Sequence, residues 1–408
     1  MPPAQTANRQ GVAVAAAIER RRTAQGAARA LLAAVALVVA TAHADPASDA
    51  AILGPANEGA RIDELRLRMT SYYQDGHGYQ SPAGPLSGPG SERALILQPM
   101  ALIGIRQSAR IHHEVVVPVD IVSAASVNAI DIMTHASGVN EAIGVEVTSR
   151  FDVTHEDQVV SRLTWHEEEP FGSGSFGLGY TRSLADDNAT LGVSGQATFD
   201  RFDYLQHDGD RLGRRNRTTL NGNVSFSQLL SPTTVFDANY GYTFQEGTLQ
   251  TTYNSVPLAS GLGRTGELFP HSRARHAVEA RLAQHLPATH TTLRAAYRYY
   301  FDTFELTAHT LELELHQYLA PRFIARGSYR YYTQTGVDFF TTAFAANGER
   351  TQPRTADSDL APFHGSEFGL KLLWLSPGQS TLDVSYFQYG RSNDFHASII
   401  SFGYGDRF

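Results

Sequence analysis

The sequence predicts an all-β protein, a transmembrane antiparallel up-and-down β-barrel of about sixteen strands. Three observations lead to this prediction. Apolar and polar residues alternate with a period of two along most of the chain. Short turns mostly alternate with longer polar loops, and the N-terminus has the pattern of an export signal. The 408 residues include no cysteine, which excludes disulfides, thiolate metal sites and cysteine nucleophiles.

Residues 1–44 are predicted to be a secretory signal peptide that is cleaved on export. Three arginines at 20–22 precede an apolar run over 30–42, and Ala-His-Ala before Asp45 matches the small-residue cleavage pattern. The alternative is an N-terminal anchor helix. The apolar run is short for a helix that spans a bilayer, so the signal peptide is the favoured interpretation.

The rest of the chain is predicted to comprise a flexible periplasmic leader over 45–60, rich in Ala, Asp, Pro and Gly, and a single barrel over 61–408. The formal net charge is −8, and the stretch before Asp45 contributes +4, so the remainder carries −12. Such an acidic chain is not expected to bind nucleic acid. No later window holds 18 apolar residues, so no membrane-spanning helix is expected.

Sixteen alternating segments are expected, most of about ten to thirteen residues, the length that a tilted strand needs to cross hydrocarbon. The first begins at Arg61, and the others cover 94–106, 111–122, 141–154, 158–167, 175–184, 190–200, 217–230, 234–245, 275–286, 291–301, 306–319, 323–334, 367–375, 381–389 and 395–408. Because the leader starts in the periplasm, an even count places both termini of the barrel there. The long loops over 248–272 and 335–364 are then expected on the outside.

Each strand has one apolar and one polar face. In the segment 291–301, Leu293 and Tyr297 share a face, and Arg294 and Arg298 share the other. In a soluble sandwich the apolar face would cover a core and the ionic face would meet water. In an outer-membrane barrel the apolar face meets lipid and the ionic face lines the lumen. The export signal and the alternating loops favour the barrel.

Charged residues on the predicted lumen face form two rows. If neighbouring strands pair across their turns, the first row reads Glu279, Arg298, Glu312 and Arg330, with each residue opposite the next. The neighbouring row is basic and consists of Arg294, His316 and Arg326. One interpretation is a structural ladder that stiffens the wall and compensates its charges. The other is a constriction whose transverse field selects solutes by charge.

No catalytic, cofactor or metal site is predicted. His112 and His113 point to opposite faces of one strand, and His166 with Glu168 offers two ligands at best. One outer loop holds a group that could serve a hydrolase or bind Ca²⁺ weakly: Asp203, His207, Asp208 and Asp210. A solvated loop is the simpler interpretation, and the protein is not expected to be an enzyme.

The chain ends on an alternating strand that closes on an aromatic residue. Ser401, Gly403 and Phe408 match the pattern of polar residue, glycine and terminal aromatic residue. This resembles the C-terminal signal that the outer-membrane assembly machinery reads. Asp406 departs from the pattern, because an aromatic residue is usual there.

Several stretches are similar to a proteobacterial family known as domain of unknown function 3570. They are Asp-Ile-Val-Ser-Ala-Ala-Ser at 120–126, Pro-His-Ser-Arg-Ala-Arg at 270–275 and the two Tyr-Arg-Tyr-Tyr stretches at 297–300 and 329–332. The similarity extends roughly over 61–408. The resemblance implies a secreted outer-membrane-type β protein and implies no activity or catalytic residue.

The expected function is that of a porin-like channel or transporter for small hydrophilic solutes in a Gram-negative outer membrane. The alternative is a non-conducting barrel that serves as a structural or docking partner, and an outer-membrane hydrolase comes third. The expected partners are outer-membrane lipid, lipopolysaccharide and, through the C-terminal strand, the assembly machinery. No cofactor is expected, and the oligomeric state and the solute stay open.

Overall fold

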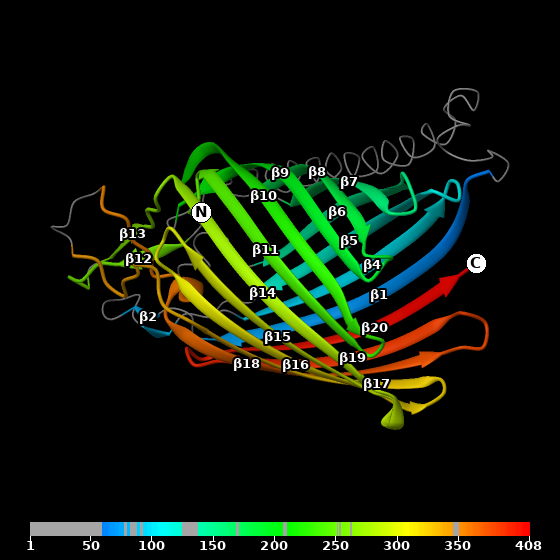
Figure 1. Cartoon of the computed structure of the whole chain (residues 1–408). Helices are drawn as coiled ribbons and strands as arrows, with labels where there is room; N and C mark the ends of the chain where they lie inside the picture. Colours follow the sequence, from blue (N-terminus) through cyan, green and yellow to red (C-terminus); the bar gives the residue numbers. More distant parts are fainter. Residues whose placement is uncertain are drawn as a thin grey trace, which may run out of the picture.

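The chain forms a closed antiparallel barrel of sixteen strands, which confirms the predicted fold class (Figure 1). The computed structural model describes residues 59–76, 80–81, 88–89, 93–124, 138–168, 171–206, 210–250, 252, 254–261, 263–345 and 351–408. The predicted signal peptide and nearly all of the leader lie outside these residues. Among the described residues no helix is long and apolar enough to cross a membrane.

The barrel strands follow one another around the wall, and β1 closes the barrel against β20. Their bounds are β1 Arg61–Gly76, β4 Ala94–Arg106, β5 Ile111–Ala124, β6 Gly138–Asp152, β7 Asp157–Glu168, β8 Phe171–Leu184, β9 Ala189–Leu205, β10 Arg211–Ser231, β11 Thr234–Gly247, β14 Ser272–Leu286, β15 Thr291–Asp302, β16 Thr307–Ala320, β17 Phe323–Gln334, β18 Phe363–Leu375, β19 Thr381–Arg391 and β20 Phe395–Arg407. Short elements outside the wall are β2 Gln80–Ser81, β3 Gly88–Pro89, β12 Ser255–Pro257, β13 Arg264–Gly266, η1 Pro287–Thr289 and η2 Ser358–Leu360.

The two ends of the barrel differ. One end, called the turn end below, carries short hairpin turns such as those at 153–156, 185–188 and 321–322. The start of β1 and the end of β20 also lie there, since the backbone N–H of Phe408 donates to the carbonyl of Asp63. The other end, called the loop end, carries the long loops that contain β12, β13 and η2 (Figure 1).

Several strands extend further toward the loop end than the hydrophobic pattern predicts. β10 begins at Arg211, six residues before the predicted start, and β18 begins at Phe363, four residues before it. The pattern fades there because the outward positions become polar, but the backbone ladder continues. The strand starts predicted at 217 and 367 were therefore wrong.

The outward face is apolar and the inward face is polar. Outward residues are largely exposed, for example Leu220 at 47% and Phe402 at 59%. On the inward face Arg68 of β1 reaches Asp383 of β19 at 3.6 Å, across the intervening strand β20. Side chains from strands two apart converge in this way on the concave side of a curved sheet. The ionic face therefore lines the lumen.

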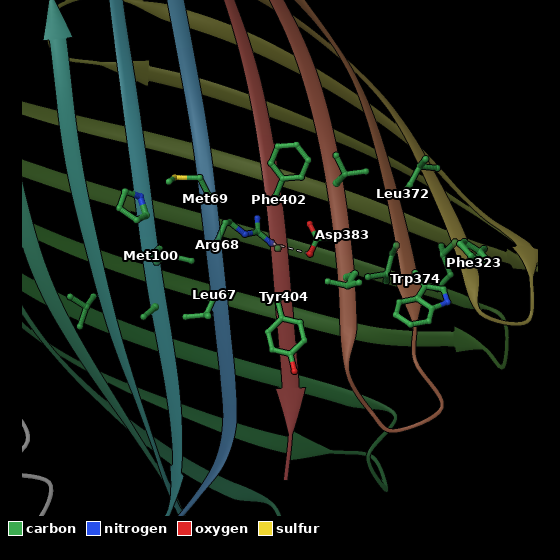
Figure 2. A pocket seen from close by; sticks show the side chains of 18 of the residues that line it. Leu67, Arg68, Met69, Met100, Phe323, Leu372, Trp374, Asp383, Phe402 and Tyr404 are labelled. Carbon is green, nitrogen blue, oxygen red and sulfur yellow. Dashed lines mark ion pairs between the residues drawn. The ribbon is translucent and has the colours of Figure 1, made fainter.

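The outward faces of β1, β4, β5 and β16–β20 form a shallow apolar groove of about 1110 Å³ (Figure 2). Leu67, Met69, Phe402 and Tyr404 line its centre, and Trp374 lies toward one side. In Figure 2 the ion pair of Arg68 with Asp383 crosses β20 where that strand holds glycine at 403. The groove faces away from the lumen and presents a continuous apolar surface, the kind that hydrocarbon solvates.

Candidate functional site

The lumen wall formed by β14–β18 is the candidate site, and its register is defined by the hairpins. Glu279 lies opposite Arg298, and Glu312 lies opposite Arg330, as predicted. Arg298 lies opposite Thr310, so the predicted contact of Arg298 with Glu312 was wrong by two residues. The four residues consequently form two cross-strand pairs with a step between them, and they do not form one continuous row.

The β15–β16 turn explains this shift. The carboxylate of Asp302 accepts hydrogen bonds from the backbone N–H groups of Phe304 at 2.8 Å and Leu306 at 3.2 Å. Glu305 adopts a positive φ of 64°, and Asp302 N–H donates to the carbonyl of Leu306 at 3.2 Å. An aspartate that caps its own turn favours this compact geometry. The turn therefore sets the pairing of β15 with β16.

Ion pairing within the stepped row is uneven. Arg330 reaches Glu312 at 3.2 Å, whereas Glu279 turns to Arg281 on its own strand at 3.1 Å. Arg298 is exposed to the lumen and, within the described part of the chain, forms no ion pair. Arg298 is thus a cation whose charge is not locally neutralised by a carboxylate.

The second predicted row is not simply basic, which corrects the prediction. Arg294 lies opposite Glu314 and reaches it at 3.7 Å, and His316 reaches the same carboxylate at 3.0 Å. Arg326 also pairs with Glu314. Three basic side chains therefore surround one acid. The sequence indicates that Glu314 faces the lumen, because it shares a face with Glu312 and His316. The predicted register, wrong by two residues, placed His316 and not Glu314 opposite Arg294.

A small niche opens in the lumen wall toward the loop end, between β17 and β1. Its cavity of about 390 Å³ combines aromatic rings with charged groups: Tyr72, Arg330, Tyr332, Glu367, Tyr389 and Arg391 are among the lining residues. The guanidinium of Arg391 pairs with Asp359 and lies 4.4 Å from the ring centroid of Phe395. Aromatic faces beside fixed polar groups can contact both the apolar and the hydroxylated parts of a small solute.

The two long loops form a common structure above the barrel, called the loop cap here and defined as the described residues of 248–271 and 335–362. Leu268 and Arg354 exchange backbone hydrogen bonds of 3.1 and 2.8 Å. The hydroxyl of Thr355 donates to the carboxylate of Glu267, and both side chains are buried. Burial lowers the pKa of Arg264 in this cap to about 10. The loops therefore hold each other in place.

The loop cap rests on the lumen side of the wall. Phe269 and Val337 of the cap pack with Phe304 and with Ala308, a lumen-facing residue of β16. The side chain of Gln334 donates to the backbone carbonyls of Asp359 at 2.9 Å and Ala361 at 2.6 Å. These additional contacts fix the cap over β15–β18, so it narrows the mouth of the lumen on that side. The alternation pattern predicts these loops on the outside but does not predict that they pack against the lumen side of the wall.

Other predicted groups are placed as follows. His112 reaches Asp63 at 3.2 Å, while His113 bonds Ser149 at 2.8 Å on the opposite face. His166 lies 3.7 Å from Glu168 in the lumen. Among the described residues no three His, Asp or Glu side chains are grouped to hold a metal.

The proposed hydrolase group is only partly described. Asp203 lies near Arg211 at 3.6 Å and Arg214 at 3.8 Å. Residues 207–209, which include His207 and Asp208, lie outside the described residues. In the C-terminal strand Ser401 is buried and faces the lumen with Gly403, whereas Phe408 is 70% exposed at the turn end.

A family model of a protein of unknown function, DUF3570, matches residues 174–399. The match covers more than half of the chain, and the protein belongs to this family. The motifs at 270–275, 297–300 and 329–332 lie within the match, and the motif at 120–126 lies before it. None of the curated proteins matches the chain.

Solved structures with a similar fold include outer-membrane proteins. A bacterial polysaccharide outer membrane secretin has a TM-score of 0.47 and 9% identity, with 84% of this chain and 98% of that chain covered. OpdK from Pseudomonas aeruginosa with vanillate has a TM-score of 0.40 and 8% identity, with 86% and 99% covered. The siderophore receptor PirA from Acinetobacter baumannii has a TM-score of 0.43 and 9% identity, with 80% of this chain covered. This chain spans about half, 52%, of the receptor's length.

Proposed function

We propose that the protein is an outer-membrane channel for the passage of small hydrophilic solutes. The observation that carries the proposal is the lumen lining, a surface of paired charges and hydrogen-bonding groups inside a closed barrel of sixteen strands. Barrels of sixteen strands or more are wide enough for a water-filled lumen. In this proposal the chain reaches a Gram-negative outer membrane through a cleaved signal peptide, and its C-terminal strand engages the assembly machinery.

The geometry supports a channel with moderate rather than strict charge selection. Glu312 with Arg330 and Asp383 with Lys371 compensate each other across neighbouring strands, so neither sign dominates the whole wall. The uncompensated Arg298 and the three basic groups around Glu314 add local positive field near β15–β17. Small anions and zwitterions are the solutes that this part of the wall favours.

The test is conductance of the purified protein in a planar lipid bilayer. Steady single-channel openings with a weak preference for anions are the expected result. A barrel that inserts, migrates as a folded species and stays electrically silent would defeat the channel proposal. It would favour the second candidate, a non-conducting docking barrel, for which the ordered loop cap over the mouth is the supporting observation.

A further inference from the structure

The outward face of β7–β10 changes from apolar to charged at a defined height. Outward positions of β9, from the turn end upward, hold Leu191, Val193, Gly195, Ala197, Phe199, Arg201, Asp203 and, at the end of the strand, Leu205. Phe199 is 61% exposed and is the last apolar residue before the two charged positions. On the neighbouring strand the outward residue opposite Asp203 is Arg214. The apolar band of a membrane barrel is about 25 Å tall, so the two arginines lie where lipid headgroups begin.

A notch interrupts the wall at the same height. Gly172 and Gly174 of β8 face outward, between Trp165 of β7 on one side and Phe199 and Arg201 of β9 on the other. A side chain at Gly174 would meet nothing nearer than a backbone oxygen 4.0 Å away. The absent side chain at Gly174 opens into a groove of about 440 Å³, whereas the carboxylate of Glu167 lies over Gly172, 3.3 Å from where a Cβ would be. The lower part of the groove is apolar, and its upper part is charged.

The charged part of the notch offers guanidinium donors to a ligand. Arg201 is exposed and, among the described residues, pairs with no carboxylate. Arg214 is 60% exposed, and its Nε lies 3.8 Å from Asp203, too far for a hydrogen bond. Glu167 also lines the groove, and Arg211 shares Asp203 with Arg214. Three guanidinium groups thus face two carboxylates.

We propose that this notch binds lipopolysaccharide through a phosphate group. An acyl chain lies over Gly174 between Trp165 and Phe199, and the phosphate is held by Arg201 and Arg214. Arginine is suited to phosphate because its planar donors match the oxygens in pairs. The site lies at the loop end, the outer leaflet in the proposed orientation. The inference requires the outer-membrane location but does not depend on conduction through the lumen.

The test measures the affinity of the purified mature barrel in detergent for fluorescently labelled lipopolysaccharide. Replacing both arginines, Arg201→Ala with Arg214→Ala, is expected to weaken binding about 100-fold, since each charge-assisted contact contributes about tenfold. The double change to lysine keeps the charge but loses the paired donors, so it is expected to weaken binding, though less than the double change to alanine. Arg182→Ala is the matched control, because Arg182 faces outward on β8 at the opposite, turn end.

A second variant tests the notch without touching a charge. Gly174→Leu fills the open space above β8 and is expected to weaken binding about tenfold while both arginines stay. Heat-modifiable migration on gels shows that each variant is still a closed barrel. A notch variant that conducts like the wild type but no longer binds lipopolysaccharide would show that lipid binding and conduction are independent, so each proposal can fail without the other.

Three outcomes would overturn the assignment. They are unchanged affinity of the double alanine variant, equal affinity for lipopolysaccharide stripped of its phosphates, and equal affinity for phosphatidylglycerol. If Gly174→Leu binds lipopolysaccharide as tightly as the wild type, the acyl chain does not lie over Gly174.

Discussion

The carboxylate of Asp302 is buried against the guanidinium of Arg273 at the loop end of the lumen. The Nε of Arg273 donates to it at 2.9 Å, and Tyr300 donates its hydroxyl at 2.6 Å. The same carboxylate caps the β15–β16 turn, and the guanidinium lies 4.5 Å from the ring centroid of Phe304 under the loop cap. One ion pair therefore links the wall, the turn and the cap.

Asp302→Ala is expected to destabilise the folded barrel by about 3–5 kcal/mol, because it leaves the buried Arg273 without its counter-charge. Urea unfolding followed by tryptophan fluorescence measures the change. Asp338→Asn is the control, since Asp338 is an exposed carboxylate in the loop cap. A stability equal to that of the wild type would show that water or another group replaces the pair.

Arg298→Glu is expected to shift the channel toward cations, because it replaces the uncompensated positive charge of the wall with a negative one. The reversal potential in a KCl gradient measures the selectivity. Arg182→Glu has the same change of charge on the outward face and is expected to leave the reversal potential unchanged. If the reversal potential of Arg298→Glu is unchanged, the charges of this wall serve only to stabilise the barrel.

Glu314→Gln is expected to increase anion permeability, since it removes the single acid that Arg294, His316 and Arg326 share. The same potential measurement applies, with Glu312→Gln as the matched control for a carboxylate that has one basic partner. The change at Glu314 is expected to be the larger of the two. A larger change for Glu312→Gln than for Glu314→Gln would contradict the inference that Glu314 neutralises three basic side chains.

A disulfide between positions 268 and 354 tests the loop cap. The two residues form a hydrogen-bonded antiparallel bridge, for which the Cα atoms lie about 5.5 Å apart, within disulfide range. The chain has no cysteine, so Leu268→Cys with Arg354→Cys introduces the only pair. Oxidation is expected to join the loops and leave the mean conductance unchanged. A large drop in conductance on oxidation would show that the loops separate during conduction.

Phe408→Ala is expected to reduce assembly into the outer membrane several-fold with little effect on the unfolding free energy of the refolded barrel. Phe408 is 70% exposed, so little apolar burial is lost. Membrane fractionation and urea unfolding separate the two effects, with Arg407→Ala as the control. An equal loss in both measurements would point to a structural role of the terminal ring.

The sequence predicted the strand count because the alternation of Leu220, Val224 and Phe226 with small polar residues follows directly from an apolar outside and a wet inside. It also gave the pairing of Glu279 with Arg298, since the β14–β15 turn is short. The pairing of Arg298 depended on how Asp302 caps the next turn, which is a matter of hydrogen-bond geometry. The loop cap depended on contacts of Leu268 with Arg354 and of Phe269 with Val337, which are far apart in the sequence.

The β15–β16 turn sets which charged residues of the two strands lie opposite each other, and so sets the electrostatics of this part of the wall. Its four residues, 303–306, determine whether Arg298 faces Thr310 or a carboxylate, although none of the paired lumen charges lies in the turn itself. Inserting or deleting two residues there would preserve the inward and outward faces while exchanging the charge partners of a whole strand. Under the channel proposal, a change in the length of this turn would therefore alter selectivity while every charged residue of the lumen is kept.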